Sequence, residues 1–253
     1  MNIVAYGGGV NSTAMCIGLY ERKIKVGHIL FADTGGERPE VYDAVEKFSK
    51  WLVDHGMPAI ATVRHVNKAG APVSLEQECL NSGTLPSLAY GFKTCSLKHK
   101  KAPQDKYVNS LPEAKAVWKS GGKVTKFIGY DADEERRAKI REDEKYLLRY
   151  PLIEWGWGRP ECLSAIRRAK LACEWPKSSC FFCPAMKKHE IRALPESLKE
   201  RAIAIERNAA PNLQTVAGLG RTFNWEQFLK NDHPDLFGTE IETPCDCYDG
   251  SSE

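Results

Sequence analysis

The sequence predicts an α/β fold: a mainly parallel five-stranded sheet with helices on both faces and a cysteine-rich C-terminal extension. Two observations predict it. Over residues 1–65, short, continuously apolar runs alternate with amphipathic segments of helical period, as parallel strands buried on both faces require. A glycine triplet then follows the first apolar run directly, where such a fold turns from strand into helix.

The individual elements follow from these patterns in chain order. In residues 39–55, for example, Val41, Val45, Phe48 and Leu52 form one apolar stripe of helical period. The predicted strands are 2–6, 26–32, 58–64 and 124–130, and the predicted helices are 12–21, 39–55, 133–146, 161–173 and 195–208. Between them, residues 67–106 are polar and interrupted by Pro and Gly, which predicts an irregular excursion at the sheet edge. Residues 151–157 are expected to be extended or a loop, and the tail from 211 is expected to be rich in loops.

Composition narrows the class of protein. We expect an α/β domain over residues 1–150 and a cysteine-rich helical extension over 151–253 that packs on it. The net charge of +3 is too mild to indicate nucleic acid by itself. No apolar run is long enough for a bilayer and no export signal is visible, so we expect a cytoplasmic protein with no membrane partner. Nine cysteines in that compartment favour metal, redox or thiol chemistry over disulfides.

The glycine triplet has the chemistry of an anion site. Its members are Gly7, Gly8 and Gly9. Glycines allow close approach of the backbone, and the first N–H groups of the following helix point at whatever binds there. The side chains that follow can cap the helix or donate to phosphate oxygens, namely Asn11, Ser12 and Thr13. The loop lacks the lysine of a P-loop and does not fit GxGxxG. The alternative is an ordinary tight turn.

The loop resembles the PP-loop of ATP pyrophosphatases, SGGxDS, with Gly7 in place of the serine and Asn11 in place of the aspartate. Four further segments are similar, in the same order, to the phosphoadenosine phosphosulfate (PAPS) reductase branch of that superfamily. They are DTGGERPE at 33–40 (DTGxExPE), CSLKHKKAP at 95–103 (C-T-x-x-x-K-x-x-P), GYDADEERR at 129–137, and CFFCP at 180–184. Together the matches span residues 3–184.

The resemblance implies an adenine nucleotide α-hydrolase-like fold that binds nucleotide at the carboxyl ends of its strands. In such a protein the loop holds the β,γ-pyrophosphate, Asp33 lies near the phosphates or Mg²⁺, and Arg137 clamps phosphate, with Arg136 as the alternative. The resemblance adds further nucleotide contacts, namely Thr34, Gly35, Lys98 and Gly129. For Asp33 the alternative is a cap of the Asp-Thr-Gly turn.

The implied activity is adenylation: an acceptor oxygen attacks the α-phosphate of ATP, pyrophosphate leaves, and a sulfur nucleophile replaces the adenylate. This predicts a sulfurtransferase whose site includes Asp33, Arg137 and Cys95, with a sulfur donor protein or sulfide as a further partner. The alternative is a reductase of PAPS or adenylyl sulfate (APS) that releases sulfite. The ECGLH-like stretch that carries the nucleophilic cysteine of such reductases is absent from the sequence.

Cys180 and Cys183 form a C-x-x-C half-site, which suits Zn²⁺ or an iron–sulfur cluster better than a thioredoxin-like redox pair. The resemblance implies a [4Fe-4S] cluster with Cys95 as the third ligand and Cys162 as the fourth, or else Cys173. The other reading is a structural Zn²⁺ held by Cys180, Cys183, Cys245 and Cys247.

Basic residues gather around the cysteine segments, and three tryptophans lie near them in sequence. The residues are Lys98, Lys100, Lys101, Arg167, Arg168, Lys170, Lys187, Lys188, Arg192, Trp155, Trp157 and Trp175. Aromatic rings among cations suit single-stranded nucleic acid, so tRNA or DNA is a candidate sulfur acceptor. A nucleic-acid-binding module with a structural zinc site is the hypothesis from another class. An ordinary solvated surface is the plain alternative.

Overall fold

The computed structural model describes residues 1–138, 143–171 and 174–231. Some of the predicted features fall at least partly outside these ranges. The helices expected at 133–146 and 161–173 and the tail expected from 211 extend beyond them, and Cys173, Cys245 and Cys247 lie outside the described residues.

The sheet has five strands, all parallel, in the order β3-β2-β1-β4-β5, which confirms the predicted α/β class. The strands are β1 (Asn2–Tyr6), β2 (His28–Asp33), β3 (Ile60–Arg64), β4 (Val124–Ile128) and β5 (Tyr146–Arg149). The chain builds outward from β1 to β3 on one side and then crosses to β4 on the other. Between β1 and β4 the order therefore reverses, and in open parallel sheets ligands bind at the carboxyl ends of the strands at such a point.

The helices are α1 (Val10–Glu21), α2 (Pro39–Asp54), α3 (Leu75–Ser82), α4 (Thr94–Ser96), α5 (Ala102–Ser110), α6 (Pro112–Lys119), α7 (Pro151–Glu154), α8 (Arg159–Arg168), α9 (Lys188–Arg192), α10 (Glu196–Ala209) and α11 (Trp225–Lys230). Four shorter turns accompany them: η1 (Ser87–Tyr90), η2 (Leu97–Lys101), η3 (Ala132–Arg137) and η4 (Ala210–Asn212).

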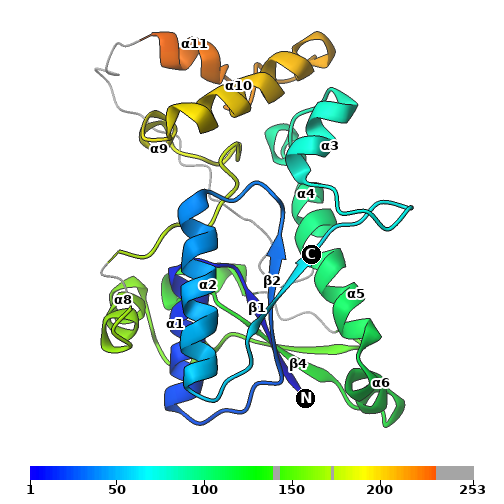
Figure 1. Cartoon of the computed structure of the whole chain (residues 1–253), viewed down its shortest axis with the longest axis vertical. Helices are drawn as coiled ribbons and strands as arrows, with labels where there is room; N and C mark the ends of the chain where they lie inside the picture. Colours follow the sequence, from blue (N-terminus) through cyan, green and yellow to red (C-terminus); the bar gives the residue numbers. More distant parts are fainter. Residues whose placement is uncertain (139–142, 172–173, 232–253) are drawn as a thin grey trace.

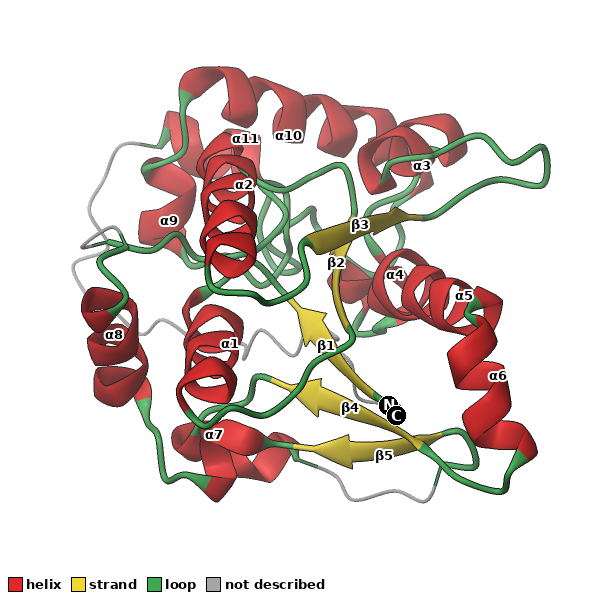
Figure 2. Cartoon of the chain, turned by 60° about the horizontal axis from the view of Figure 1, so that its bottom comes forward, coloured by secondary structure: helices red, strands yellow, loops and turns green. Residues whose placement is uncertain are grey.

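Both faces of the sheet are buried, as the continuous apolar strands predict. Val4 of β1 packs into a core with α1, α2 and α8, whereas its neighbour Ile3 points to the other face, against α5 and α6. Figure 2 shows α1 and α2 on one side of the strands and α5 and α6 on the other. Successive side chains of a strand alternate between faces, so every position of β1 needs an apolar residue.

A second apolar cluster lies beyond the carboxyl ends of the strands, where α3, α9, α10 and α11 meet around Phe181 and Phe182 (Figure 1). Glu206 of α10 anchors it. This carboxylate is buried and accepts backbone N–H bonds from Leu219 at 2.7 Å and Trp225 at 3.0 Å. The part of the chain after residue 150 therefore divides: α8 packs on α1 in the main core, and α9–α11 join α3.

Three expectations about elements were wrong. Residues 151–157 were expected to be extended or a loop, but Pro151–Glu154 form the short helix α7. Residues 133–146 do not form one helix: the short 3₁₀ turn η3 ends at Arg137, and Tyr146 already begins β5. The described residues between them, 138 and 143–145, are not helical. The polar segment 67–106 is more regular than expected, because it contains α3 and the start of a nearly continuous helix that runs from Thr94 to Ser110. No helix in the described ranges is long and apolar enough to cross a bilayer.

Candidate functional site

A cavity of about 220 Å³ lies at the carboxyl ends of β1, β2 and β4, at the point where the strand order reverses. Ala5 and Tyr6 end β1, Ala32 lies near the end of β2, and Gly129 follows β4; all four line the cavity. The lining also includes Gly7, Gly9, Val10, Asn11, Ser12, Lys100, Gln104, Glu134, Arg137, Arg159, Lys177 and Ser178. The structure thus brings the glycine loop and the 129–137 segment together, 120 residues apart.

The glycine loop presents the start of α1 to this cavity. The helix begins at Val10, Gly9 is its N-cap, and no side chain caps the first turn. The first N–H groups of the helix and the positive end of its dipole therefore remain for an anion. Gly8 has φ +84° and a Cβ there would lie 3.1 Å from Val41, so only glycine fits. Gly8 itself faces the core and lies outside the cavity lining.

The second close approach is at Gly129. A Cβ at this position would lie 3.0 Å from both the backbone nitrogen and the Cα of Ser12. A side chain here would push the loop after β4 away from the first turn of α1. Glycine therefore lets the two walls of the cavity meet.

Four cations line the cavity against one lining carboxylate, Glu134, and two of them, Lys100 and Lys177, also pair with Glu37 and Glu190, which are not in the lining. Arg137 pairs with Glu134, and its guanidinium lies 4.2 Å from the ring centre of Tyr130. Lys100 is only 15% exposed and its Nζ lies 3.7 Å from the buried carboxylate of Glu37. The other two cations are Arg159 and Lys177. Arg137, which the resemblance implies as a phosphate clamp, lines the cavity, whereas Arg136, the alternative, is exposed and outside the lining.

Asn11 connects the two walls. Its Nδ2 donates to Asp131 at 2.9 Å and to Glu134 at 3.0 Å, and its Oδ1 accepts from Arg159 at 3.3 Å. Burial, followed by the charge of Glu134, raises the pKa of Asp131. An aspartate at position 11 would put a third carboxylate against these two. This explains physically why the chain departs here from the SGGxDS pattern.

Asp33 is brought close to the cavity but does not line it. Its Oδ1 accepts from the backbone N–H of Gly35 at 2.7 Å and from the hydroxyl of Tyr42 at 2.8 Å, and its Oδ2 pairs with Arg64 at 2.7 Å. The carboxylate therefore has the geometry of the turn cap that was the alternative reading of this residue. A direct contact with phosphate or Mg²⁺ would require Arg64 and Tyr42 to release it.

Three other expected contacts also lie outside the lining. Thr13 is fully buried, and its hydroxyl bonds to the Gly9 carbonyl at 2.9 Å and the Tyr6 hydroxyl at 3.0 Å. Thr34 is buried with its hydroxyl 3.2 Å from the sulfur of Cys180. Gly35 has φ +70°, and a Cβ there would meet Ser74 at 2.5 Å. These three residues support the walls of the cavity and do not line it.

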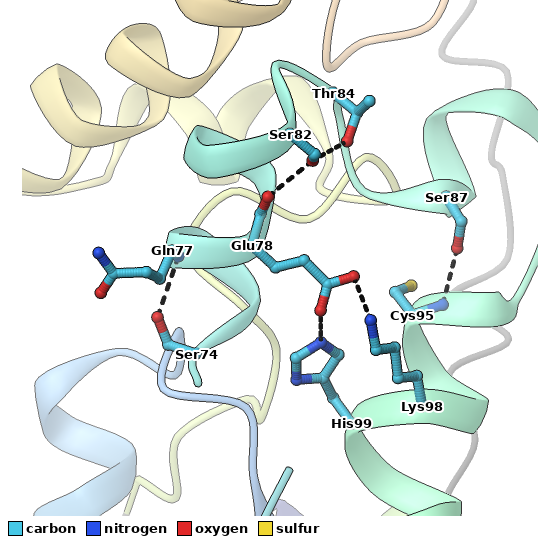
Figure 3. Close-up of polar contacts among 9 residues, drawn as sticks. All are labelled: Ser74, Gln77, Glu78, Ser82, Thr84, Ser87, Cys95, Lys98 and His99. Atoms are coloured by element: carbon cyan, nitrogen blue, oxygen red, sulfur yellow. Dashed lines mark hydrogen bonds and ion pairs between the residues drawn. The ribbon is translucent and has the colours of Figure 1, made fainter. Parts of the chain in front are cut away.

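Lys98 and Lys100 differ in where their side chains point. Lys98 donates to Glu78 at 2.7 Å, beside His99, whose Nε2 lies 2.9 Å from the same carboxylate (Figure 3). Lys100, not Lys98, lines the cavity. The pattern C-T-x-x-x-K already places its lysine five positions after Cys95, which is Lys100, so the signal was present in the sequence.

The local cause is a turn of π-helix at η2, before α5. Pro103 has no amide hydrogen and cannot donate to the carbonyl four residues earlier, that of His99. The wider turn changes the angular position of the residues in it. In this turn the side chains of Lys98 and His99 point toward Glu78 of α3, and the side chain of Lys100 points into the cavity.

The cysteines fall into two groups. Cys95 and Cys180 pack with the buried Cys79 in the cluster beyond the strand ends. Burial raises the pKa of Cys79 to about 12, and neighbouring groups that include Cys95 and Cys180 contribute. Burial, followed by the charge of Glu37, likewise raises the pKa of Cys180 to about 12. Cys183 follows in the same turn, where its N–H donates to the Cys180 carbonyl at 3.0 Å. No partner of Cys79 can be predicted from the sequence, and only the packing of its side chain reveals its neighbours.

The structure does not bring Cys162 to this group. Its side chain is fully buried in α8, in the main core that α8 shares with α1. Burial raises its pKa to about 12, and its charged neighbours are Asp131, Arg159 and Glu161. Among the described residues, no three His, Cys, Asp or Glu side chains converge as ligands of one metal ion. The set implied for an iron–sulfur cluster is therefore not assembled, namely Cys95, Cys162, Cys180 and Cys183.

The aromatic residues expected near a nucleic-acid surface are engaged in packing. Trp175 is 9% exposed and donates its indole N–H to the Gly8 carbonyl at 3.1 Å. Trp155 packs on α1, with the guanidinium of Arg22 4.0 Å from its ring centre. Arg168 of α8 forms an ion pair with Glu21 of α1. The cavity itself, and not an aromatic surface, is thus the feature with the clearest binding chemistry.

No protein-family model and no curated protein sequence matches the chain. Among solved structures, the chain is similar to the U34-tRNA thiolase NcsA from Methanococcus maripaludis with its [4Fe-4S] cluster. The identity is 11% and the TM-score is 0.44, and the match covers 96% of this chain and 77% of that one.

Proposed function

We propose that the chain is an ATP-dependent enzyme of the PP-loop kind, a sulfurtransferase that adenylates its acceptor and releases pyrophosphate. The observation that carries the proposal is the cavity. A helix N-terminus without a side-chain cap and four cations surround one space at the carboxyl ends of parallel strands. That arrangement suits a nucleotide polyphosphate better than a neutral or cationic ligand.

In this proposal the loop and its neighbours hold the phosphates. The N–H groups of Val10 to Ser12 and the side chains of Arg137 and Lys100 stabilise the charge that develops on pyrophosphate as it leaves. Mg²⁺ enters with the nucleotide, and the carboxylate that lines the cavity is Glu134. Asp33 acts as a positioning residue, because it holds Arg64, Tyr42 and the 33–35 turn in place.

An iron–sulfur cluster is part of the proposal, with Cys95, Cys180 and Cys183 as its ligands. Thiolates are the ligands that such clusters prefer, and two of these cysteines, Cys95 and Cys180, pack in one cluster although they come from distant segments. Cys162 is left out because it belongs to the other core. When bound, a cluster with three protein ligands supplies an open iron for sulfide. The described structure holds no converged ligand set, so no step of the reaction is derived through it.

The acceptor in this proposal is tRNA. Two of the cations that line the cavity, Arg159 and Lys177, are exposed, and Lys177 also pairs with Glu190. Such exposed cations favour a polyanionic substrate over a neutral one.

The experiment uses protein purified without oxygen and incubated with ATP, Mg²⁺, sulfide and unfractionated tRNA. The expected result is release of pyrophosphate that depends on tRNA, together with thiolated nucleosides detected by mass spectrometry after digestion. A parallel incubation with PAPS or APS and a dithiol tests the reductase alternative. Release of sulfite there, with no ATP turnover in the first incubation, would overturn the proposal.

A further inference from the structure

Gln104 is a buried amide in the wall of the cavity. The residue is 2% exposed, it lies in the first turn of α5, and it lines the same space as the glycine loop. Its Oε1 is buried and accepts no hydrogen bond from any residue that the structure describes. Buried side-chain acceptors are nearly always paired, because an unpaired one loses its bonds to water without replacement.

Gln104 and Lys100 both line the cavity from one stretch of helix. Four positions apart, their side chains lie on one face. Lys100 carries positive charge and its Nζ lies near Glu37. Gln104 is uncharged, and the lining also includes the small residues Ala5 and Ala32 near the ends of β1 and β2. The cavity thus offers an uncharged amide as well as cations.

We propose that Gln104 reads the base of the nucleotide and selects adenine. The carboxamide offers an acceptor beside a donor. Adenine presents the complementary pair, a 6-amino donor beside a ring-nitrogen acceptor, and glutamine pairs with that edge in two hydrogen bonds. The ligand supplies the partner that Oε1 lacks. This inference rests on the proposed function, since it takes an adenine nucleotide as the ligand.

The test compares two nucleotides and two proteins. ATP and purine riboside triphosphate differ only in the 6-amino group, and Gln104→Met replaces the amide by an apolar side chain of similar length. In calorimetric titrations with Mg²⁺, Gln104→Met should bind ATP about tenfold more weakly than the wild type does. It should weaken the binding of purine riboside triphosphate less than that of ATP, because this nucleotide keeps only the ring-nitrogen partner of the amide.

The stability of the unliganded protein provides a second readout. Because Oε1 has no partner to lose, Gln104→Met should melt at or above the temperature of the wild type without nucleotide, and ATP should raise that temperature less. A merely structural role would lower the melting temperature of the free protein and would overturn the inference.

Two results separate the failure of this inference from the failure of the proposed function. If the wild type binds both nucleotides and Gln104→Met weakens both equally, the base contact is wrong while nucleotide binding stands. If the wild type binds neither, the proposed function falls and the base contact falls with it.

Discussion

The indole N–H of Trp175 donates to the carbonyl of Gly8 at 3.1 Å, which joins the segment before the cysteine pair to the glycine loop across 167 residues. Both residues are buried. The bond therefore fixes the loop from the core side while the other side of the loop faces the cavity.

Trp175→Phe keeps an aromatic ring but removes this donor. The buried carbonyl of Gly8 loses its partner, so the free energy of unfolding should fall by about 1–3 kcal/mol, and the affinity for Mg·ATP should fall several-fold. Urea denaturation and titration measure the two effects. Trp155→Phe is the control, because it removes ring area without this bond. Equal ATP affinity in the wild type and Trp175→Phe would show that the loop does not need the tie.

Variants of Arg137 and Arg136 allow a matched comparison that tests the phosphate site. Arg137 lines the cavity and Arg136, its neighbour in sequence, is exposed outside it. Arg137→Met should weaken Mg·ATP binding by a factor of ten or more, on the order of 1.4 kcal/mol, and Arg136→Met should leave it nearly unchanged. Affinity lost equally in both variants would mean that general surface charge, not the cavity, attracts the nucleotide.

Substitution of Cys162 tests whether this side chain packs in the core or binds metal. It is fully buried between α8 and α1, away from Cys95 and Cys180. Cys162→Ala should lower the free energy of unfolding by about 1 kcal/mol through the small cavity it leaves, with the iron content of anaerobically purified protein unchanged. Cys95→Ala should lower the iron content. The ligand assignment fails if Cys162→Ala loses the metal and Cys95→Ala retains it.

His99 should make stability depend on pH. Burial lowers its pKa below the usual 6.5, although Glu78 at 2.9 Å opposes the shift. Between the folded pKa and 6.5 the unfolded chain binds a proton that the folded chain does not. The contribution of His99 to the free energy of unfolding is therefore fully present above pH 6.5. It is lost as the pH falls from 6.5 through the pKa of the folded protein.

Denaturation midpoints at about pH 7.5 and about pH 5.5 check this. His99→Gln should flatten the decline between them. The pKa of Glu78 is lowered as well, so its own contribution is lost only below 4.5 and does not interfere at these pH values. An unchanged slope in His99→Gln would assign the decline to another group.

The parts of the fold that follow from local pattern could be predicted. Residues 3–6 of β1, an apolar run before three glycines, predict a buried strand that turns into a helix, and the structure confirms it. β5 was not predicted from the sequence. The strand has only four residues, and Leu147 is half exposed, so neither a long apolar run nor a clear alternation of apolar and polar side chains marks it.

The parts of the site that depend on distant partners could not be predicted. Whether Asp33 faces a phosphate or caps a turn is decided by Arg64, 31 residues later. The π-helical turn before Pro103, which turns Lys98 and Lys100 in different directions, is not visible in the sequence, although the C-T-x-x-x-K spacing already indicated Lys100. Cys79 joins Cys95 and Cys180 only through the packing of α3, and no spacing rule relates these positions.

The most direct test of the central claim is a calorimetric titration of the wild type and Gly7→Ala with Mg·ATP. Gly7 lines the cavity, and a Cβ there would have only the hydroxyl of Ser12 near it, at 3.8 Å. The added methyl therefore leaves the fold intact and occupies space at the loop. We expect saturable binding of one ATP by the wild type, competition by pyrophosphate, and a loss of affinity of tenfold or more in Gly7→Ala. Absence of binding in the wild type, or equal binding in both proteins, would contradict the account.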